Sequence, residues 1–331
     1  MKIVVTGANG FVGTALCTRL LKDGHQVTAL TRRLSQSPSY GVTWVKGDML
    51  SFGPWQTWLA GQEIVIHLAA VAHQVRSRGD QSAMTNECQS VNRDATLALA
   101  KLASASGVRR FIYVSTIGVN GTCSGQQPFT EMSPALPQDG YAVSKYQAEC
   151  GLSDFVERCA MELVIVRPPL VYGTNAPGNF SRLMRLIARG IPLPLAAVDN
   201  RRSLIAVENL VDFLQLCSVH SAAAGECFLV SDGKDISTPE LVRQLASGMK
   251  RPACLVWVPL PLLRVASRLT GLERVYSGLC GTLQIDASKA ERLLGWRPAV
   301  SFEAAIRSVG EEYLKASAVF ESTISENSVD K

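Results

Sequence analysis

A tyrosine and a lysine four residues apart, in the pentapeptide YAVSK, form a pair that could transfer a proton. Their spacing places Tyr141 and Lys145 on one face of a helix. A free phenol has a pKa of ~10, and a nearby ammonium lowers that pKa by favouring the phenolate. Such a tyrosine can protonate a carbonyl oxygen as a hydride reaches the carbon. The alternative is an ordinary pair on the surface of a helix. The elements around the pair decide between a catalytic and a surface role.

Three glycines follow the first apolar run of the chain, in the stretch TGANGFVG. Small residues at Gly7, Gly10 and Gly13 allow the backbone to approach a pyrophosphate, which the amino end of the following helix attracts. An ordinary glycine turn is the alternative. The position between the first strand and the first helix favours a dinucleotide site.

The second strand is followed by Thr31, Arg32 and Arg33. At this place an Asp or Glu normally binds the adenosine ribose of NAD, whereas an arginine accommodates the 2′-phosphate of NADP. A guanidinium can hold a phosphate through two parallel hydrogen bonds. The residues therefore favour NADP(H), and NAD(H) stays possible. The alternative is that both arginines form a solvated strand end.

Strand-like and helix-like segments alternate along the first half of the chain, which is typical of a parallel sheet with helices on both faces. We expect an α/β fold: a Rossmann-type doubly wound parallel sheet with a smaller, interleaved C-terminal α/β substrate domain. Strands are expected near residues 3–5, 26–30, 42–45, 64–68, 111–115, 163–167 and 227–230, and helices near 11–21, 90–104, 141–158, 181–188, 241–248 and 302–314.

The expected cofactor domain covers residues 1–170, and the segments 203–232 and 281–290 return to it. Residues 171–316 form the substrate domain, and 317–331 a disordered tail.

Composition excludes several classes of protein. With 47% hydrophobic and 18% charged residues, the chain is neither disordered nor fibrous, and the net charge of +5 is scattered, which argues against a nucleic-acid partner. Nine cysteines form no CxxC pair or metal spacing, so we expect no metal and reduced thiols. The opening MKIVVTGANG leaves no room for a signal peptide, which predicts a cytoplasmic protein. The apolar run 254–263 is too short to span a bilayer, so we expect a buried or lid segment and no membrane partner.

Together the motifs resemble the extended short-chain dehydrogenase/reductase family, in its branch of nucleotide-sugar epimerases, dehydratases and reductases. The resemblance covers nearly the whole chain. It rests on TGANGFVG, GDM at 47–49, HLAA at 67–70, VN at 91–92, VST at 114–116, YAVSK, RPPLVYG at 167–173, RRSLIAVENLVD at 201–212 and LGW at 294–296.

The resemblance implies a catalytic set of Thr116, Tyr141 and Lys145. Thr116 would bind the C4 oxygen of the sugar, and Lys145 would also hold the nicotinamide ribose. Asp48 and Met49 would contact adenine. The complete implied cofactor site comprises Gly7, Asn9, Gly10, Phe11, Val12, Gly13, Thr31, Arg32, Arg33, Asp48, Met49, Leu68, Ala69, Ala70, Asn92, Ser115, Tyr141, Lys145, Pro168 and Val171.

The resemblance also implies a UDP-sugar substrate. Asn179 and Arg202 would hold its diphosphate, which suits a bidentate donor, although Arg202 could be a plain surface residue. The complete implied substrate site comprises His73, Thr116, Tyr141, Asn179, Leu183, Leu193, Leu195, Arg202, Arg274 and Asp286. By the same analogy, a homodimer is expected through the helices at 90–104 and 141–158.

The cofactor preference favours a reductase, because a reductase consumes NADPH on every turnover whereas an epimerase keeps one NAD. The Asp-Glu pair of dehydratases is replaced by Ile117 and Gly118, which disfavours dehydration. The chain therefore resembles a UDP-4-keto-6-deoxy-N-acetylhexosamine 4-reductase of bacterial surface-polysaccharide synthesis. The alternatives are an NAD-dependent UDP-hexose or UDP-N-acetylhexosamine 4-epimerase, a reductase of small ketones, and an NADP sensor without turnover.

Overall fold

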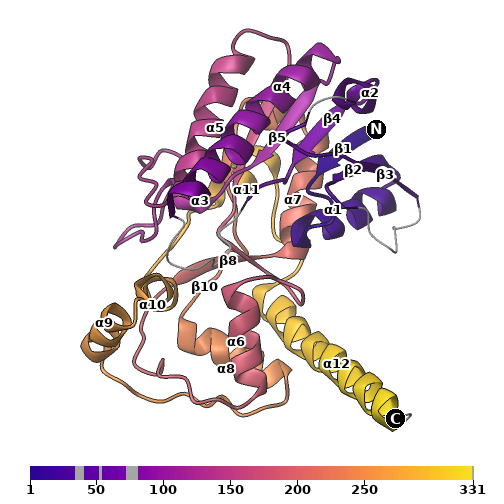
Figure 1. Cartoon of the computed structure of the whole chain (residues 1–331). Helices are drawn as coiled ribbons and strands as arrows, with labels where there is room; N and C mark the ends of the chain where they lie inside the picture. The colour runs from indigo at the N-terminus through magenta and orange to yellow at the C-terminus, as the bar shows by residue number, and fades with distance from the viewer. Residues whose placement is uncertain (34–40, 52–53, 72–80, 330–331) are drawn as a thin grey trace.

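A parallel seven-stranded sheet with helices on both faces forms the larger part of the molecule (Figure 1). The computed structural model describes residues 1–33, 41–51, 54–71 and 81–329, except for the side chains of 81–84 and 316–329. The expected fold class is confirmed. The strands are β1 (Lys2–Thr6), β2 (Gln26–Thr31), β3 (Val42–Lys46), β4 (Ile64–His67), β5 (Arg110–Val114), β6 (Glu162–Arg167), β7 (Leu170–Tyr172), β8 (Arg202–Ala206), β9 (Cys227–Leu229) and β10 (Asp235–Ile236).

The α-helices are α1 (Phe11–Lys22), α2 (Trp55–Leu59), α3 (Gln81–Cys88), α4 (Ala95–Ala105), α5 (Gly140–Val156), α6 (Asn179–Ala188), α7 (Val207–Val219), α8 (Thr238–Gly248), α9 (Leu260–Leu269), α10 (Glu273–Cys280), α11 (Ser288–Leu294) and α12 (Phe302–Val329). A π-helical turn, η1 (Gln89–Asp94), precedes α4, and two 3₁₀ turns are η2 (Ile117–Val119) and η3 (Ser221–Ala223).

The order of the large sheet is β3-β2-β1-β4-β5-β6-β9, and all its neighbours are parallel. Side chains of a strand alternate between the two faces. Ile3 and Val5 therefore pack with α1 and α7, whereas Val4 packs with α4 and α5 on the other face. The strand order reverses between β1 and β4, and such a reversal opens a ligand crevice at the carboxyl ends of the strands.

The smaller part of the molecule is built on a second sheet, with the order β10-β8-β7. Its core joins α6, α8 and α12 around residues such as Phe180, Leu245 and Ile306. β6 and β7 are separated only by Pro168 and Pro169, so the chain passes directly from one sheet to the other. This junction places the carboxyl end of β6 beside the smaller part.

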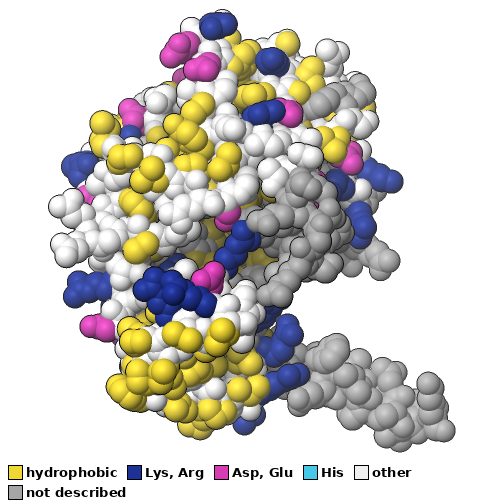
Figure 2. Space-filling view, turned by 60° about the vertical axis from the view of Figure 1, so that its left-hand side comes forward, with side chains coloured by type: hydrophobic (Ala, Val, Ile, Leu, Met, Phe, Trp, Pro, Cys, Tyr) yellow, Lys and Arg dark blue, Asp and Glu magenta, His cyan; other side chains and the backbone are white. Residues whose placement is uncertain are grey.

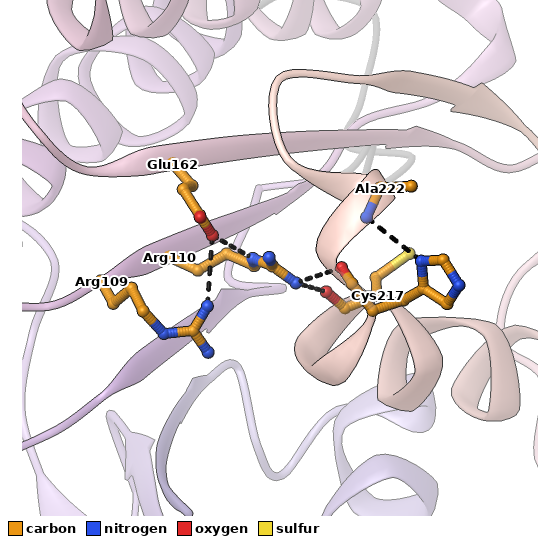
Figure 3. A network of polar contacts seen from close by, with 6 residues as sticks. Arg109, Arg110, Glu162, Cys217 and Ala222 are labelled. Carbon is orange, nitrogen blue, oxygen red and sulfur yellow. Dashed lines mark hydrogen bonds and ion pairs between the residues drawn. The ribbon is translucent and has the colours of Figure 1, made fainter. Parts of the chain in front are cut away.

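A buried arginine ties α7 to the large sheet (Figure 3). Arg110 is 1% exposed; its Nε donates to Glu162 on β6, and its Nη1 donates to the carbonyl oxygens of Cys217 and His220. The carbonyls at the end of a helix lack partners within the helix, and a cation there also complements the helix dipole. Arg110 therefore stabilises the end of α7 and its position against β5.

Two segments differ from expectation. The helix α12 extends to Val329, through most of the stretch expected to be a disordered tail, because no proline or glycine interrupts the chain after Gly310. The run 254–263 is not a buried segment, one of the two alternatives expected for it: Trp257 and Leu262 are exposed, and the run leads into α9. Among the described residues no helix is both long and apolar enough to cross a bilayer.

Candidate cofactor and sugar site

The glycine loop between β1 and α1 is tightly packed against the end of β4. Gly7 has a φ of +68°, and a Cβ there would lie 2.8 Å from the backbone nitrogen of Ala69. A Cβ at Gly13 would lie 2.2 Å from the carbonyl oxygen of Gly7. Gly10 is the N-cap of α1, without a side-chain cap and without an acid in the first turn. This amino end can therefore receive an anion from outside the chain.

The cavity next to the ends of β2 and β3 has a volume of about 290 Å³ and is lined by two cationic side chains. Arg32 and Lys46 both line it, together with Asp48. Trp58, Ser51, Gly47 and Pro54 complete the lining. Lys46 pairs with Thr31 in the sheet, so the two strand ends bring both positive charges to one place.

Arg33 is arranged differently from Arg32. Both side chains are exposed, but Arg33 is not among the residues that line the cavity. Its carbonyl oxygen accepts hydrogen bonds from the Thr31 hydroxyl, at 2.9 Å, and from the Asn9 amide, at 3.4 Å. Thr31 and Asn9 therefore shape the strand end through the Arg33 backbone.

Lys145 lies inside the protein at the end of β5. Its Nζ donates to the carbonyl oxygen of Val114 at 2.8 Å and lies 4.6 Å from the centre of the Tyr113 ring. Burial lowers the pKa of Lys145 to about 7, against a smaller opposite effect of the Glu149 carboxylate. Glu149 forms a buried ion pair with Arg167. A buried ammonium with one hydrogen bond retains two further donors for a ligand.

The pKa of Tyr141 differs from the sequence expectation. Burial, with the charges of Asp139 and Cys88, raises the pKa of Tyr141 to about 12. The expected lowering of this pKa by Lys145 is therefore wrong here: desolvation is the largest influence, and the two charges beside the phenol act in the same direction. The phenol is therefore protonated at neutral pH.

The end of β5 carries two hydroxyl groups. The buried Ser115 Oγ has no hydrogen-bond partner among the described residues. Thr116 is the N-cap of η2, where its Oγ1 accepts from the Gly118 backbone nitrogen. A hydroxyl in that role can still donate its own hydrogen, so Thr116 can bind an oxygen of a ligand.

Two polar residues near the cofactor loops support the backbone. Asn92 bonds to both backbone groups of Val71 and donates to Ser144, so it fixes the loop after β4. The ring nitrogens of His67 lie 2.7 and 2.8 Å from the hydroxyls of Thr6 and Thr96. Burial lowers the pKa of His67 to about 3, so the ring stays neutral.

The remaining implied cofactor residues lie around these groups. Met49 and Pro168 are buried, whereas Phe11, Val12, Leu68, Ala69, Ala70 and Val171 are half-buried along the ends of β1, β4 and β7. Phe11 also approaches Gly173, where a Cβ would lie 2.8 Å from its ring.

Arg202, at the start of β8, is a half-buried cation. Its Nη1 donates to the carbonyl oxygen of Gly281 at 2.9 Å, and no carboxylate in the described part of the chain pairs with it. Burial lowers the pKa of Arg202. A buried charge is costly unless it is paired, so this position favours an anionic ligand.

Other implied substrate residues lie in the core of the smaller part, at helix starts or outside the described residues. Leu183, Leu193 and Leu195 are buried in the core of the smaller part. Asp286 lies at the start of α11, where hydrogen bonds from the Ser288 side chain and then from the Ser288 backbone nitrogen lower the pKa of Asp286. Asn179 and Arg274 are exposed at the starts of α6 and α10, and His73 lies outside the described residues.

Sequence reasoning missed Lys46 and the ion pair of Glu149 with Arg167. Lys46 is the last residue of an expected strand, parallel to the one that ends at Thr31, so strand pairing was the available signal. The helical spacing of Lys145 and Glu149 indicated only that this carboxylate lies near Lys145, not that it pairs with Arg167. In the described ranges, no group of three His, Cys, Asp or Glu could hold a metal ion.

Comparisons with known proteins agree with this architecture. A UDP-glucose 4-epimerase of Vibrio cholerae is 36% identical over 317 residues, which cover 95% of this chain and 96% of that one. The N-acetyl-alpha-D-glucosaminyl-diphospho-ditrans,octacis-undecaprenol 4-epimerase of Escherichia coli O157:H7 is 28% identical over 87% of this chain and 88% of its own.

The solved structure of MoeE5 in complex with UDP-glucuronic acid and NAD has the same fold, with a TM-score of 0.77 over 96% of this chain and 100% of that one, at 24% identity. The model of the NAD dependent epimerase/dehydratase family matches residues 3–230. The resemblance inferred from the motifs is thereby confirmed: the chain belongs to the NAD dependent epimerase/dehydratase family and is an enzyme of the short-chain dehydrogenase/reductase type.

Proposed function

We propose that the protein is an NADPH-dependent reductase of the 4-keto group of a UDP-4-keto-6-deoxy-N-acetylhexosamine, in bacterial surface-polysaccharide synthesis. The observation that carries the direction of the reaction is the cavity lined by Arg32 and Lys46. Two cations can bind a 2′-phosphate, and that phosphate distinguishes NADP from NAD. The carboxylate of Asp48 lies in the same cavity, where it accepts a hydrogen bond from the Leu50 backbone nitrogen.

The glycine loop fits the rest of the cofactor. Gly7 and Gly13 provide backbone close to the amino end of α1, which suits a pyrophosphate. Lys145 would hold the nicotinamide ribose with its remaining donors. NADPH, when bound, supplies the hydride.

The residues at the end of β5 serve the sugar. Thr116 would donate a hydrogen bond to the keto oxygen, and Tyr141 would donate the proton that the oxygen needs. A pKa of about 12 keeps the Tyr141 phenol protonated at neutral pH, the form that a reduction requires. Arg202 would bind the diphosphate and so position the reacting carbon.

An NAD-dependent UDP-sugar 4-epimerase is the second candidate. The 36% identical relative from Vibrio cholerae, which is named a UDP-glucose 4-epimerase, favours it. An epimerase must first remove a proton and a hydride, so it needs a base at Tyr141 at the start of each cycle, and it retains its cofactor.

Cofactor titrations of single variants test the phosphate assignment. Arg32→Ala and Lys46→Ala should each weaken NADPH binding about tenfold, as expected for the loss of about 1.4 kcal/mol in one charged hydrogen bond, and leave NADH binding nearly unchanged. Arg33→Ala is the matched control, because Arg33 is exposed next to Arg32 and does not line the cavity. Equal losses for NADPH and NADH in the Arg32 and Lys46 variants would reject the assignment.

The reaction is tested with a UDP-4-keto-6-deoxy-N-acetylhexosamine and NADPH. Wild-type protein should oxidise NADPH in proportion to the keto sugar, and Tyr141→Phe should abolish this turnover with unchanged circular dichroism. Retained NAD in the purified protein, together with conversion of a UDP-hexose without added reductant, would establish the epimerase instead.

A further inference from the structure

A stripe of exposed apolar side chains runs along α9. Leu262, Val265 and Leu269 are three and four residues apart, so they share one face of the helix. Leu269 is 83% exposed, and Trp257 before the helix is 68% exposed. We call this surface the α9 patch; it consists of Val256, Trp257, Leu262, Val265, Leu269 and Leu272. Contiguous exposed apolar surface of this kind marks a binding site more often than isolated exposed residues do.

Basic residues surround the α9 patch. Between residues 250 and 283 the sequence has five basic residues, Lys250, Arg251, Arg264, Arg268 and Arg274, and a single acid, Glu273. All five basic residues are exposed. Glu273 lies 3.4 Å from Arg268, and no other ion pair of these five is found in the described part of the chain. Figure 2 shows the hydrophobic group at the lower end of the molecule with Lys and Arg side chains directly above it.

We propose that the α9 patch binds the surface of a bilayer that contains acidic phospholipids. An amphipathic helix with leucine and tryptophan on one side and arginine on the other lies in the plane of the interface: its apolar side chains enter the acyl boundary, and its cations face the headgroups. Each nearby arginine adds electrostatic attraction to an acidic leaflet. The expectation of no membrane partner rested on the length of the run 254–263, which excludes a spanning helix but not one lying on the surface.

The same charges argue against a second copy of this chain as the occupant. A symmetric pair would place the basic rim of one copy opposite the basic rim of the other, and like charges across an interface are unfavourable. The homodimer expected through α4 and α5 would use the opposite end of the molecule and would leave α9 uncovered (Figure 1).

The helix that follows the α9 patch, α10, ends next to the candidate sugar site. The carbonyl oxygens of Leu279 and Gly281, at the end of α10, accept hydrogen bonds from the Asn200 amide. The Gly281 carbonyl also accepts from Arg202, the residue proposed to bind a diphosphate. A bilayer on α9 would thus hold this site close to the lipid surface. The membrane proposal does not depend on which sugar reaction the site performs.

Co-sedimentation with large unilamellar vesicles tests the proposal directly. The full chain should bind vesicles of phosphatidylcholine with phosphatidylglycerol at 3:1, and bind vesicles of phosphatidylcholine alone much more weakly. Leu262→Ser with Leu269→Ser should weaken binding about tenfold or more. Arg264→Gln should weaken it about fivefold at low salt, and added salt should weaken wild-type binding. Met132→Ser is the matched control, since Met132 is 91% exposed but lies outside the α9 patch.

Tryptophan fluorescence gives a second measurement. Of the five tryptophans, all within the described ranges, Trp257 is the one classed as exposed. Acidic vesicles should shift the emission to shorter wavelength, and Trp257→Phe should remove the shift. The Leu262→Ser and Leu269→Ser variant should keep wild-type turnover of a soluble UDP sugar.

Equal binding to both kinds of vesicle, or undiminished binding by the leucine variant, would overturn the proposal. A change of oligomeric state in the leucine variant would also overturn it and would assign the α9 patch to self-association. A negative result in the vesicle experiments does not change the outcome of the cofactor titrations. The membrane proposal and the proposed function can therefore be refuted independently.

Discussion

Replacing Arg110 by methionine tests how much one buried guanidinium contributes to stability. Methionine keeps an apolar stem of similar shape but removes the hydrogen bonds to Glu162 and to the carbonyls of Cys217 and His220. The buried Cys217 carbonyl would lose its charged donor, which costs about 1–3 kcal/mol, whereas the His220 carbonyl keeps the Ala223 backbone nitrogen at 3.3 Å. Glu162 is partly exposed and keeps Arg109 at 3.2 Å, so its carboxylate adds little to the loss. We therefore expect Arg110→Met to lower the free energy of unfolding by about 1–3 kcal/mol.

Urea unfolding followed by circular dichroism measures this loss. Arg109→Met is the matched control, because Arg109 also pairs with Glu162 but its side chain is 45% exposed (Figure 3). An exposed ion pair contributes about 0–1 kcal/mol, so the control should stay close to wild type. If both variants shift the urea midpoint equally, the hydrogen bonds of Arg110 to the two carbonyls do not contribute the stability expected here. Burial would then not explain a difference in stability between the two arginines.

Three further outcomes follow from the packing and the pKa values. Gly13→Ala places a methyl group against loop backbone, so it should destabilise the fold by about 1–3 kcal/mol and weaken cofactor binding. Gly278→Ala places its methyl group in open space and should have neither effect. Thermal unfolding and NADPH titration compare the two variants. Tyr172→Phe removes a 2.7 Å hydrogen bond to the buried Asp232 carboxylate and should cost about 1.5–3 kcal/mol in urea unfolding. Burial lowers the pKa of Lys145 from 10.5 to about 7, so the unfolded chain binds more protons between these values. Stability from this group therefore rises with pH across that window, by at most about 1.4 kcal/mol per unit, and Lys145→Met should lose that part of the slope.

The parallel sheet and the glycine loop could be predicted because local patterns determine them. Apolar runs of four to six residues become central strands, and the residues after Val5 and Ile66 then meet at one edge of the sheet. The position of Arg32 just after β2 could be predicted for the same reason, because the end of a strand can be recognised in the sequence.

Other parts depend on contacts that a sequence does not display. Leu183, Leu193 and Leu195 are assigned to the substrate by resemblance alone, and the sequence did not show that all three side chains pack in the core of the smaller part. The raised pKa of Tyr141 arises from desolvation, which depends on the whole packing around it. The exposure of Trp257 could not be inferred, since an apolar run has the same sequence pattern whether it is buried or exposed to solvent.

The chain crosses between the two sheets repeatedly: β6 leads into β7, β8 into α7 and β9, and β9 into β10. Residues from both sides of these crossings share one core, as Ile205 and Trp296 do with Leu16. Neither part can be excised as an autonomous fragment, because each cut would remove strands or core residues from the other. Limited proteolysis should therefore give either intact protein or small peptides, and unfolding should be a single concerted transition.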